Sequence, residues 1–362
     1  MPRHVAVFVS AALILASASA FAPPSAAQEG AVDKLYAELF KLPPAERSKR
    51  IAEGAAKEGQ ALLRPSFRSG PGQAMMGAFA KEYPNLKVSW DLAVSQSVAE
   101  KFIAEARVGR YESDVTSGAI SEISEVINRN LEAKYPSPAA DAILPKYRPF
   151  ADSQSRWVLS HLNDIGISYN PTLIEPGQDP QSWEDLCAPR FHGLVSYEPA
   201  QTRMLAGLYQ LYGGDYDKVE KLLKCIGDNK PIMLPGNTTR MLLMMAGDHA
   251  VSANLSLGGA IDMNRKNPKK APFAINYKIP LMSYAEGFAI SKNTARPYTT
   301  ALYLDWVLGP VNQQLVYNNV RGPVTMDHPY HPPNVQLVPV GIVDSATLEK
   351  LYALWNKNVG RR

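Results

Sequence analysis

The chain is poor in cysteine and histidine, and only its N-terminal segment contains a sustained apolar run. Among 362 residues there are two cysteines and six histidines, and lysine plus arginine exceed aspartate plus glutamate by 38 − 34 = +4. So small an excess of positive charge does not favour a nucleic-acid-binding protein. After the N-terminal segment, no stretch approaches the roughly 20 apolar residues that a membrane-spanning helix needs.

Motifs that carry catalysis or bind cofactors are also missing. The sequence has no phosphate-binding loop, no G-x-S-x-G, no zinc signature and no G-x-G-x-x-G fingerprint. No histidine stands in a context typical of a nucleophile–base pair, so we expect neither an enzyme nor a bound cofactor. His328 and His331 share a proline-rich loop, but no third ligand with sensible spacing lies near them, so we assign no metal site.

The first 28 residues have the layout of a secretory signal. Arg3 provides a basic start, a mostly apolar run covers 5–15, and small residues occupy 16–20. This order predicts cleavage just after the small residues or near Ala27, and export to the periplasm. A membrane anchor is the alternative, although the apolar run is short for one. The 362 − 28 = 334 remaining residues suffice for two domains.

The two cysteines, Cys187 and Cys225, remain after such a cleavage. An exported chain matures in an oxidising compartment, where an even number of cysteines favours a disulfide. Closing this loop would stabilise the fold by about 3–4 kcal/mol in the chain-entropy treatment. Two buried free thiols are the alternative.

Strands and helices alternate through the first part of the chain. After a helical leader over 29–58, strands are expected at 60–65, 86–92 and 114–116, with helices between and after them. This alternation is typical of an α/β fold whose parallel sheet is covered by helices. Small polar turns follow these strands, and the free N–H groups and positive end of the next helix favour anions there. From these turns we select Ser66, Arg68, Ser95 and Ser117.

Similar polar turns follow the strands expected further along the chain. A strand at 194–197 leads into a polar turn, and another strand is expected at 250–254. Ligands of open α/β sheets bind outside the carboxyl ends of the strands. The candidates from this part are Gln201, Thr202, Arg203, Asn237, Thr238, Asn254 and Ser256.

Two blocks of the sequence resemble a known family. The first is Ser182–Gly193 (SWEDLCAPRFHG), and the second is Arg296–Gln313, which contains Asp305-Trp306. Ala104–Val115 (AEARVGRYESDV) continues the likeness. These blocks are similar to those of bacterial extracellular solute-binding proteins, the capture components of ABC importers, in the group that includes ferric-ion and thiamine binders.

This resemblance implies a type II periplasmic-binding-protein fold. Two lobes, each a mainly parallel sheet flanked by helices, would be joined by two hinge crossovers. Lobe 1 would comprise 59–163 with 283–362, and lobe 2 would comprise 164–282. The resemblance also implies a monomer without nucleic acid that delivers a small solute to an inner-membrane ABC permease.

The solute would lie between the lobes, where Tyr284 and Glu286 near the return crossover join the candidates above. Arg68 and Arg203 could clamp a carboxylate or phosphate bidentately, so an anionic organic solute is our first expectation. Ferric ion is the second. Ferric binders of this family carry adjacent tyrosines where this chain has Asn254-Leu255, so iron would need Tyr197, Tyr284 and Glu286 instead. An exported enzyme on the same fold is the third.

Overall fold

The computed structural model describes residues 30–64, 69–90, 95–199, 202–266, 272–328 and 331–360, with only the backbone of 69, 70, 95 and 96. The predicted signal segment lies outside these residues. Within them, no helix combines the length and apolar character needed to cross a membrane.

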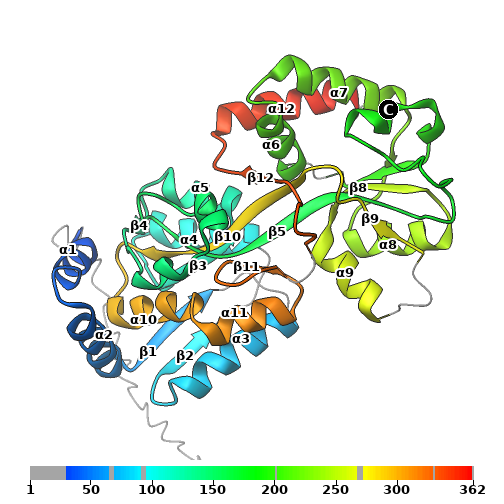
Figure 1. The fold of residues 1–362 in the computed structure, drawn as a ribbon. Helices are drawn as coiled ribbons and strands as arrows, with labels where there is room; N and C mark the ends of the chain where they lie inside the picture. Colours follow the sequence, from blue (N-terminus) through cyan, green and yellow to red (C-terminus); the bar gives the residue numbers. More distant parts are fainter. Residues whose placement is uncertain are drawn as a thin grey trace, which may run out of the picture.

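Within the described residues, twelve strands form one sheet, whose main path runs β2-β1-β3-β10-β5-β8-β6-β7 (Figure 1). The strands are β1 (Gln60–Arg64), β2 (Lys87–Trp90), β3 (Val115–Ala119), β4 (Glu132–Ala133), β5 (Val158–Tyr169), β6 (Val195–Tyr197), β7 (Ile232–Met233), β8 (Val251–Ser256), β9 (Ala274–Ile275), β10 (Leu281–Ser291), β11 (Gly322–Pro323) and β12 (Leu337–Val340). We name β1–β3 with their helices the first half, and β6–β8 with theirs the second half. The expected α/β architecture is thus confirmed.

Helices cover both halves of the sheet. They are α1 (Ala31–Leu39), α2 (Pro44–Glu58), α3 (Ser69–Glu82), α4 (Ser95–Arg107), α5 (Ile120–Ile127), α6 (Thr202–Leu211), α7 (Tyr216–Asp228), α8 (Asn237–Ala246), α9 (Leu257–Lys266), α10 (Pro297–Val307), α11 (Pro310–Asn318) and α12 (Ser345–Asn358). Short 3₁₀ helices are η2 (Pro138–Ala142), η3 (Pro145–Phe150), η4 (Glu184–Cys187) and η5 (Pro189–Phe191).

The parallel strands of the two halves run in opposite directions, because β10 and β5 between them pair antiparallel with each other and with β3 and β8. β3 ends at Ala119, level with His161 of β5 across β10. β8 ends at Ser256, opposite Ile165 of β5. The carboxyl ends of both halves therefore face each other across residues 162–164.

β5 is one continuous strand, whereas its sequence, RWVLSHLNDIGISY, predicted strands with a turn. Asn163 and Asp164 resemble turn residues. In the structure both are buried, and their side chains bond to Glu286 and to Ser283 of β10. Cross-strand partners therefore override the local turn preference.

The N-terminal leader packs on α10 of the first half. A Cβ at Gly54 of α2 would meet the ring of Tyr298 at 2.2 Å, so only glycine allows this approach. Glu58 accepts hydrogen bonds from the backbone N–H groups of Tyr298 and Thr299 at 3.0 and 2.7 Å. Its carboxylate thereby satisfies N–H groups at the start of α10 that have no partner within the helix.

The last helix, α12, packs on α6 and α7 of the second half (Figure 1). A Cβ at Gly227 of α7 would meet the backbone oxygen of Asn358 at 2.0 Å, and Lys357 pairs with Glu220 at 2.6 Å. The expected domain bounds had assigned all of 283–362 to the first lobe. The difference arises because β12 runs along the second-half end of β10 and directs the chain back there.

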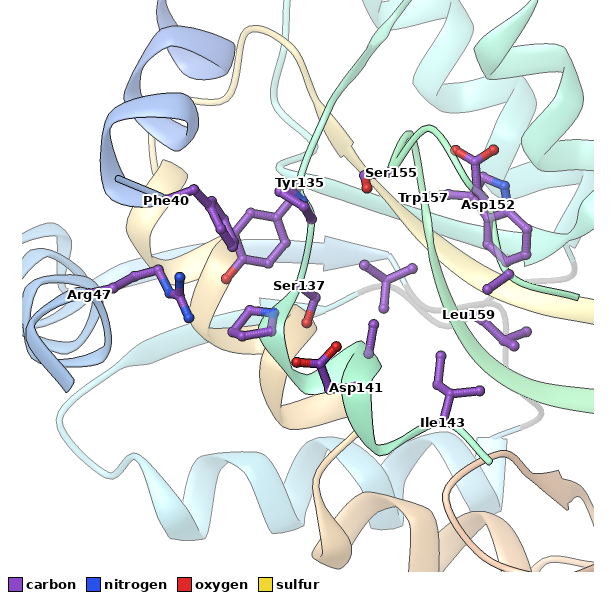
Figure 2. Close-up of a pocket in the computed structure, with 15 residues that line it drawn as sticks. Phe40, Arg47, Tyr135, Ser137, Asp141, Ile143, Asp152, Ser155, Trp157 and Leu159 are labelled. Atoms are coloured by element: carbon purple, nitrogen blue, oxygen red, sulfur yellow. The ribbon is translucent and has the colours of Figure 1, made fainter. Parts of the chain in front are cut away.

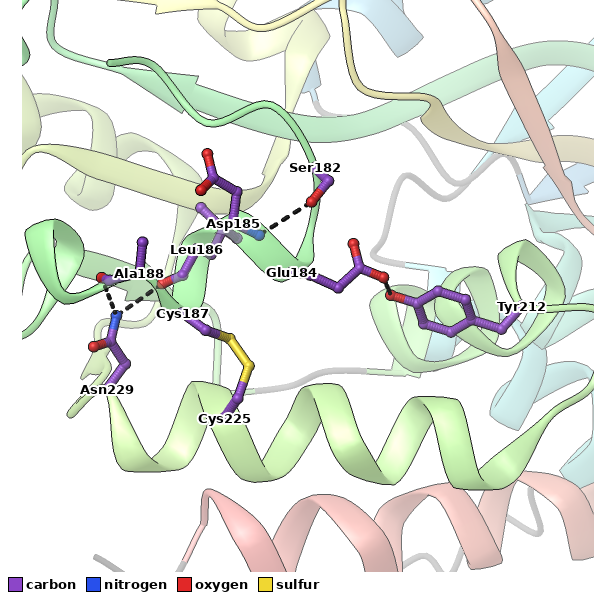
Figure 3. The surroundings of a disulfide bond; sticks show 9 residues. All are labelled: Ser182, Glu184, Asp185, Leu186, Cys187, Ala188, Tyr212, Cys225 and Asn229. Atoms are coloured by element: carbon purple, nitrogen blue, oxygen red, sulfur yellow. Dashed lines mark hydrogen bonds between the residues drawn. A yellow bond between two sulfur atoms is a disulfide. The ribbon is translucent and has the colours of Figure 1, made fainter.

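The two family-like blocks, Ser182–Gly193 and Arg296–Gln313, serve the packing of the fold. In the first block, Ser182 accepts a hydrogen bond from the backbone N–H of Asp185 at 3.1 Å, Trp183 is buried, and Cys187 forms a disulfide with Cys225 of α7 (Figure 3). The predicted bridge is confirmed, and it ties η4 to α7. The contacts of this block thus stabilise the second half.

The second block plays the same part in the first half. Trp306 of α10 donates to Glu82 of α3 at 2.8 Å. The buried amide of Gln313 donates to the backbone oxygen of Ser160 and accepts from the N–H of Val324, both at 2.8 Å. Gln313 therefore holds α11, β5 and the segment after β11 together.

Candidate functional site

The candidate site is the region where the two sets of carboxyl ends meet, bordered by the starts of α5, α6, α8 and α9. Ligands of open α/β sheets bind outside such ends. The first turn of each helix also offers backbone N–H groups and a positive dipole end. Both halves thus present groups that favour an anion.

Arg203 stands on the first turn of α6 and reaches the crossover strand β10. Its Nη1 donates to the Tyr284 hydroxyl at 2.9 Å, and its guanidinium carbon lies 4.4 Å from the centre of that ring. Electrostatic interaction with Tyr284, ahead of that with Glu286, raises the pKa of Arg203. The predicted residues Arg203 and Tyr284 are therefore together, and the guanidinium remains charged.

Glu286 lies two residues further along β10, on the same face as Tyr284. It is buried and accepts a hydrogen bond from the Asn163 amide at 2.8 Å, and Asn163 in turn accepts one from Arg321. Burial raises the pKa of Glu286 despite the opposing effects of Arg203 and Arg321. Asn163 and Arg321 were not selected from the sequence.

A hydrogen-bonded network joins the strand ends of the second half. Arg240 is fully buried at the start of α8 and donates to Ala253 O at 2.6 Å, Asn254 Oδ1 at 2.9 Å and Asn237 Oδ1 at 3.0 Å. Asn237 Oδ1 also accepts from the N–H of Ser256 at 3.1 Å. Burial lowers the pKa of Arg240 to about 10. Asn237, Asn254 and Ser256 are thus brought together, but through an arginine that sequence reasoning missed.

Asn254 has a positive φ of 43°, a conformation that asparagine tolerates better than most residues. Its Oδ1 also accepts from the backbone N–H of Glu198, 3.2 Å away. The Glu198 carboxylate accepts from the N–H of Gly236 at 2.7 Å, just before α8. These bonds lock the ends of β6 and β8 and the start of α8 into one unit.

The other predicted site residues divide into three groups. Ser66, Arg68 and Gln201, and the side chain of Ser95, lie outside the described part of the chain. Ser117 is buried in β3, where its hydroxyl donates to the backbone oxygen of Arg64 at 3.4 Å. The Thr202 hydroxyl bonds to that of Tyr352 of α12, and Thr238 is exposed.

Tyr197, expected as an iron ligand, is a core residue. Only 1% of it is exposed, and its ring centre lies 6.4 Å from that of Trp355 on α12. Burial raises the pKa of its hydroxyl. Since Tyr284 bonds to Arg203, the structure does not assemble Tyr197, Tyr284 and Glu286 into a ligand set. Tyr197 was expected near the solute because the sequence did not reveal that Trp355 of α12 packs against it.

A separate hollow of about 400 Å³ lies at the far end of the first half (Figure 2). The turn after α1 and the segment 135–159 line it, and Arg47, Asp141 and Asp152 give it charges of both signs. A mixed lining of this kind does not select one class of ligand.

Residues 81–256 match the family model described as bacterial extracellular solute-binding protein. The predicted resemblance is confirmed. The matched residues run from the end of α3 to the end of β8. A comparison with curated proteins finds no match.

Solved solute-binding proteins share this fold. Iron-bound HitA from Pseudomonas aeruginosa is 16% identical, with a TM-score of 0.69 over 82% of this chain and 98% of that one. AfuA from Actinobacillus pleuropneumoniae, with fructose-6-phosphate bound, is 20% identical, with a TM-score of 0.65 over 84% and 99%. PotD from Streptococcus pneumoniae, a spermidine/putrescine binding protein, is 15% identical, with a TM-score of 0.65 over 82% and 98%. At these identities the likeness establishes the two-lobe fold alone.

Proposed function

We propose that this solute-binding protein captures a small anionic organic solute between its two halves and delivers it to a membrane ABC permease. The proposal places the solute at the facing strand ends, with Arg203 as the main anchor. It goes beyond the family in naming the charge of the solute. Related proteins bind iron, a sugar phosphate and polyamines, according to their names, so the class must come from the residues of this chain.

The observation that carries the proposal is the pairing of Arg203. Among the described residues, no carboxylate lies within ion-pair distance of its guanidinium, which bonds instead to the neutral hydroxyl of Tyr284. Burying a cation costs free energy unless its charge is compensated, and Glu286 offsets only part of this cost because it acts on Arg203 from beyond ion-pair distance. A carboxylate or phosphate of the solute would provide that compensation, and guanidinium geometry suits both.

Glu286 is the main argument for a cationic solute, but the surroundings of its carboxylate weaken that argument. Its carboxylate lies among Arg203, Arg321 and the amide of Asn163. Burial raises its pKa, so the protonated, uncharged form is favoured more than in water. A polyamine would need a carboxylate whose charge is not already opposed by two nearby arginines.

Ferric ion is the alternative solute. We rank it second because of the residues that stand where ferric binders of the family carry tyrosines. Asn254 is held by Arg240 and Glu198, and Leu255 beside it is fully buried. No phenolate oxygen is therefore available on this turn. Ferric ion would therefore need ligands from elsewhere in the chain.

We further propose that the protein is exported to the periplasm after loss of residues 1–28, and that it acts there as a monomer. Bending of β5 and β10 would bring the two halves together around the solute. No chemical step and no nucleic acid belongs to this proposal. The solute would favour the closed over the open state through contacts with both halves.

A thermal-shift screen tests this function. The exported protein is heated with carboxylates, phosphorylated sugars, polyamines and ferric citrate, because a ligand bound only to the native state raises the melting temperature. We expect the largest shift with an organic anion. A shift with ferric citrate alone, or with polyamines alone, would contradict the proposal.

Variants then test the anchor. Arg203→Ala, alone and with Arg68→Ala, should weaken binding of that anion at least about tenfold, because a charge-assisted hydrogen bond is lost. The matched control is Arg129→Ala, whose guanidinium pairs with Glu125 on the surface of α5. Equal affinities of Arg203→Ala, Arg129→Ala and the wild type would show that Arg203 is not an anchor.

A further inference from the structure

Three metal-ligating side chains meet on the other face of the crossover strands. Asp164 follows Asn163 on β5, and Ser283 precedes Tyr284 on β10, so each pair of neighbours points to opposite faces. Asp164 therefore points away from the face that carries Tyr284 and Glu286. His328 and His331, from the segment between β11 and β12, lie against it.

The three ligand atoms are close enough to share one ion. His331 Nε2 lies 2.8 Å from Asp164 Oδ2, and His328 Nε2 lies 4.0 Å from the same oxygen. All three ligand atoms lie within 4.8 Å of one another. Zinc binds histidine nitrogen and carboxylate oxygen at about 2.0–2.2 Å, so its ligand atoms are about 3–4 Å apart. Small side-chain shifts would give these separations.

The side chains are also held in place by their neighbours. The Ser283 hydroxyl donates to Asp164 Oδ1, which leaves Oδ2 turned toward both histidines. The His328 and His331 rings stack with centres 3.7 Å apart at 11°. The His328 ring packs on Gly322 of β11, where a Cβ would lie 3.0 Å from it. All three side chains are at most 8% exposed.

We infer that Asp164, His328 and His331 form a binding site for a divalent transition-metal ion, with zinc as the best fit. Two imidazoles and one carboxylate suit zinc and ferrous iron, whereas calcium and magnesium prefer all-oxygen sites. Three protein ligands leave a coordination position for water. The hydrogen bond from Ser283 is the outer contact that orients a ligating carboxylate.

This site is independent of the proposed solute site. It uses none of Arg203, Tyr284 and Glu286, and it ties the segment after β11 to both crossover strands. A bound ion would fix that segment against β5 and β10, where the two halves are joined. The chemistry assigns the ion a positional role, with no reaction step.

Zinc binding to untagged protein, first stripped with a chelator, tests the inference. Competition against a chromogenic zinc indicator should give one zinc ion per chain. His331→Ala should weaken binding at least about 100-fold, and Ser283→Ala, which removes only the outer contact, should weaken it about tenfold. Cobalt(II) in place of zinc should give visible absorption bands in the wild type that His331→Ala lacks.

His192→Ala is the matched control, because His192 is an exposed histidine on the turn before β6. Its zinc affinity should equal that of the wild type. Melting curves without metal check that each variant is folded. If His331→Ala does not fold, Ser283→Ala still tests the inference. Absence of a zinc equivalent in the wild type, or equal affinity of His331→Ala and wild type, would overturn the inference.

Discussion

Asp305 shows how a residue that helped to identify the family serves the fold. Its carboxylate accepts hydrogen bonds from the Tyr135 hydroxyl at 2.8 Å and the Ser137 hydroxyl at 2.6 Å. Burial raises its pKa to about 6, against the effect of these two donors. Asp305 therefore holds the segment after β4 against α10. Keeping its carboxyl group ionised in this buried position costs free energy.

This cost gives the stability a pH dependence of known sign. Between about pH 4 and pH 6 the native carboxyl binds a proton that the unfolded one has lost, so this group's contribution to stability falls as the pH rises. In Asp305→Asn that fall should be absent. Urea denaturation at pH 4, 5, 6 and 7 should show the variant gaining roughly 1–2 kcal/mol on the wild type across the window. A constant difference between the two proteins would contradict this account.

At the scale of the element, the crossover strand β10 is closely constrained around Gly287. Its pairing with β5 shifts register between Glu286 and Gly287. A Cβ at Gly287 would meet the Trp157 ring at 2.3 Å and the backbone oxygen of Val158 at 2.6 Å. Because one of these obstacles is backbone, the strands can accommodate a side chain only by moving apart.

Gly287→Ala should therefore destabilise the fold and disturb the site together. We expect a loss of about 2 kcal/mol or more, as is typical when a well-packed interior is overfilled. Glu286 should also move relative to Asn163, so that solute affinity falls. Urea denaturation and solute titration measure the two effects. Gly77→Ala is the control, since a Cβ there would meet nothing within 4 Å.

Most elements could be read from the sequence to within a few residues, because helices and strands alternate and each is bounded by polar turns. Short strands such as β4, β7 and β12 were not expected, and β5 carries turn-like residues whose bonds are made to other strands. The residues of the site were harder to predict, because their partners also lie on distant parts of the chain. Arg240 reads as a surface residue of a helix start, and Asp164 precedes His328 by 328 − 164 = 164 residues. Only the folded chain brings such residues together.

At the scale of the whole molecule, the Cys187–Cys225 bridge acts on the unfolded chain as well as on its neighbours. It spans 38 residues of sequence and therefore restricts the denatured ensemble. Replacing both cysteines by serine should lower the free energy of unfolding by about 4 kcal/mol in the chain-entropy treatment. Denaturation under non-reducing conditions measures this. Equal stability with and without the bridge would show that the treatment fails here.

Long-range packing also orders the assembly of the molecule during its synthesis. α7, which spans Tyr216–Asp228, is covered by α12 at Ser345–Asn358, and α2 is covered by α10. Neither half can complete its core until the ribosome has made segments far downstream. Until those segments emerge, one face of α7 and one face of α2 lack the helices that cover them in the finished fold.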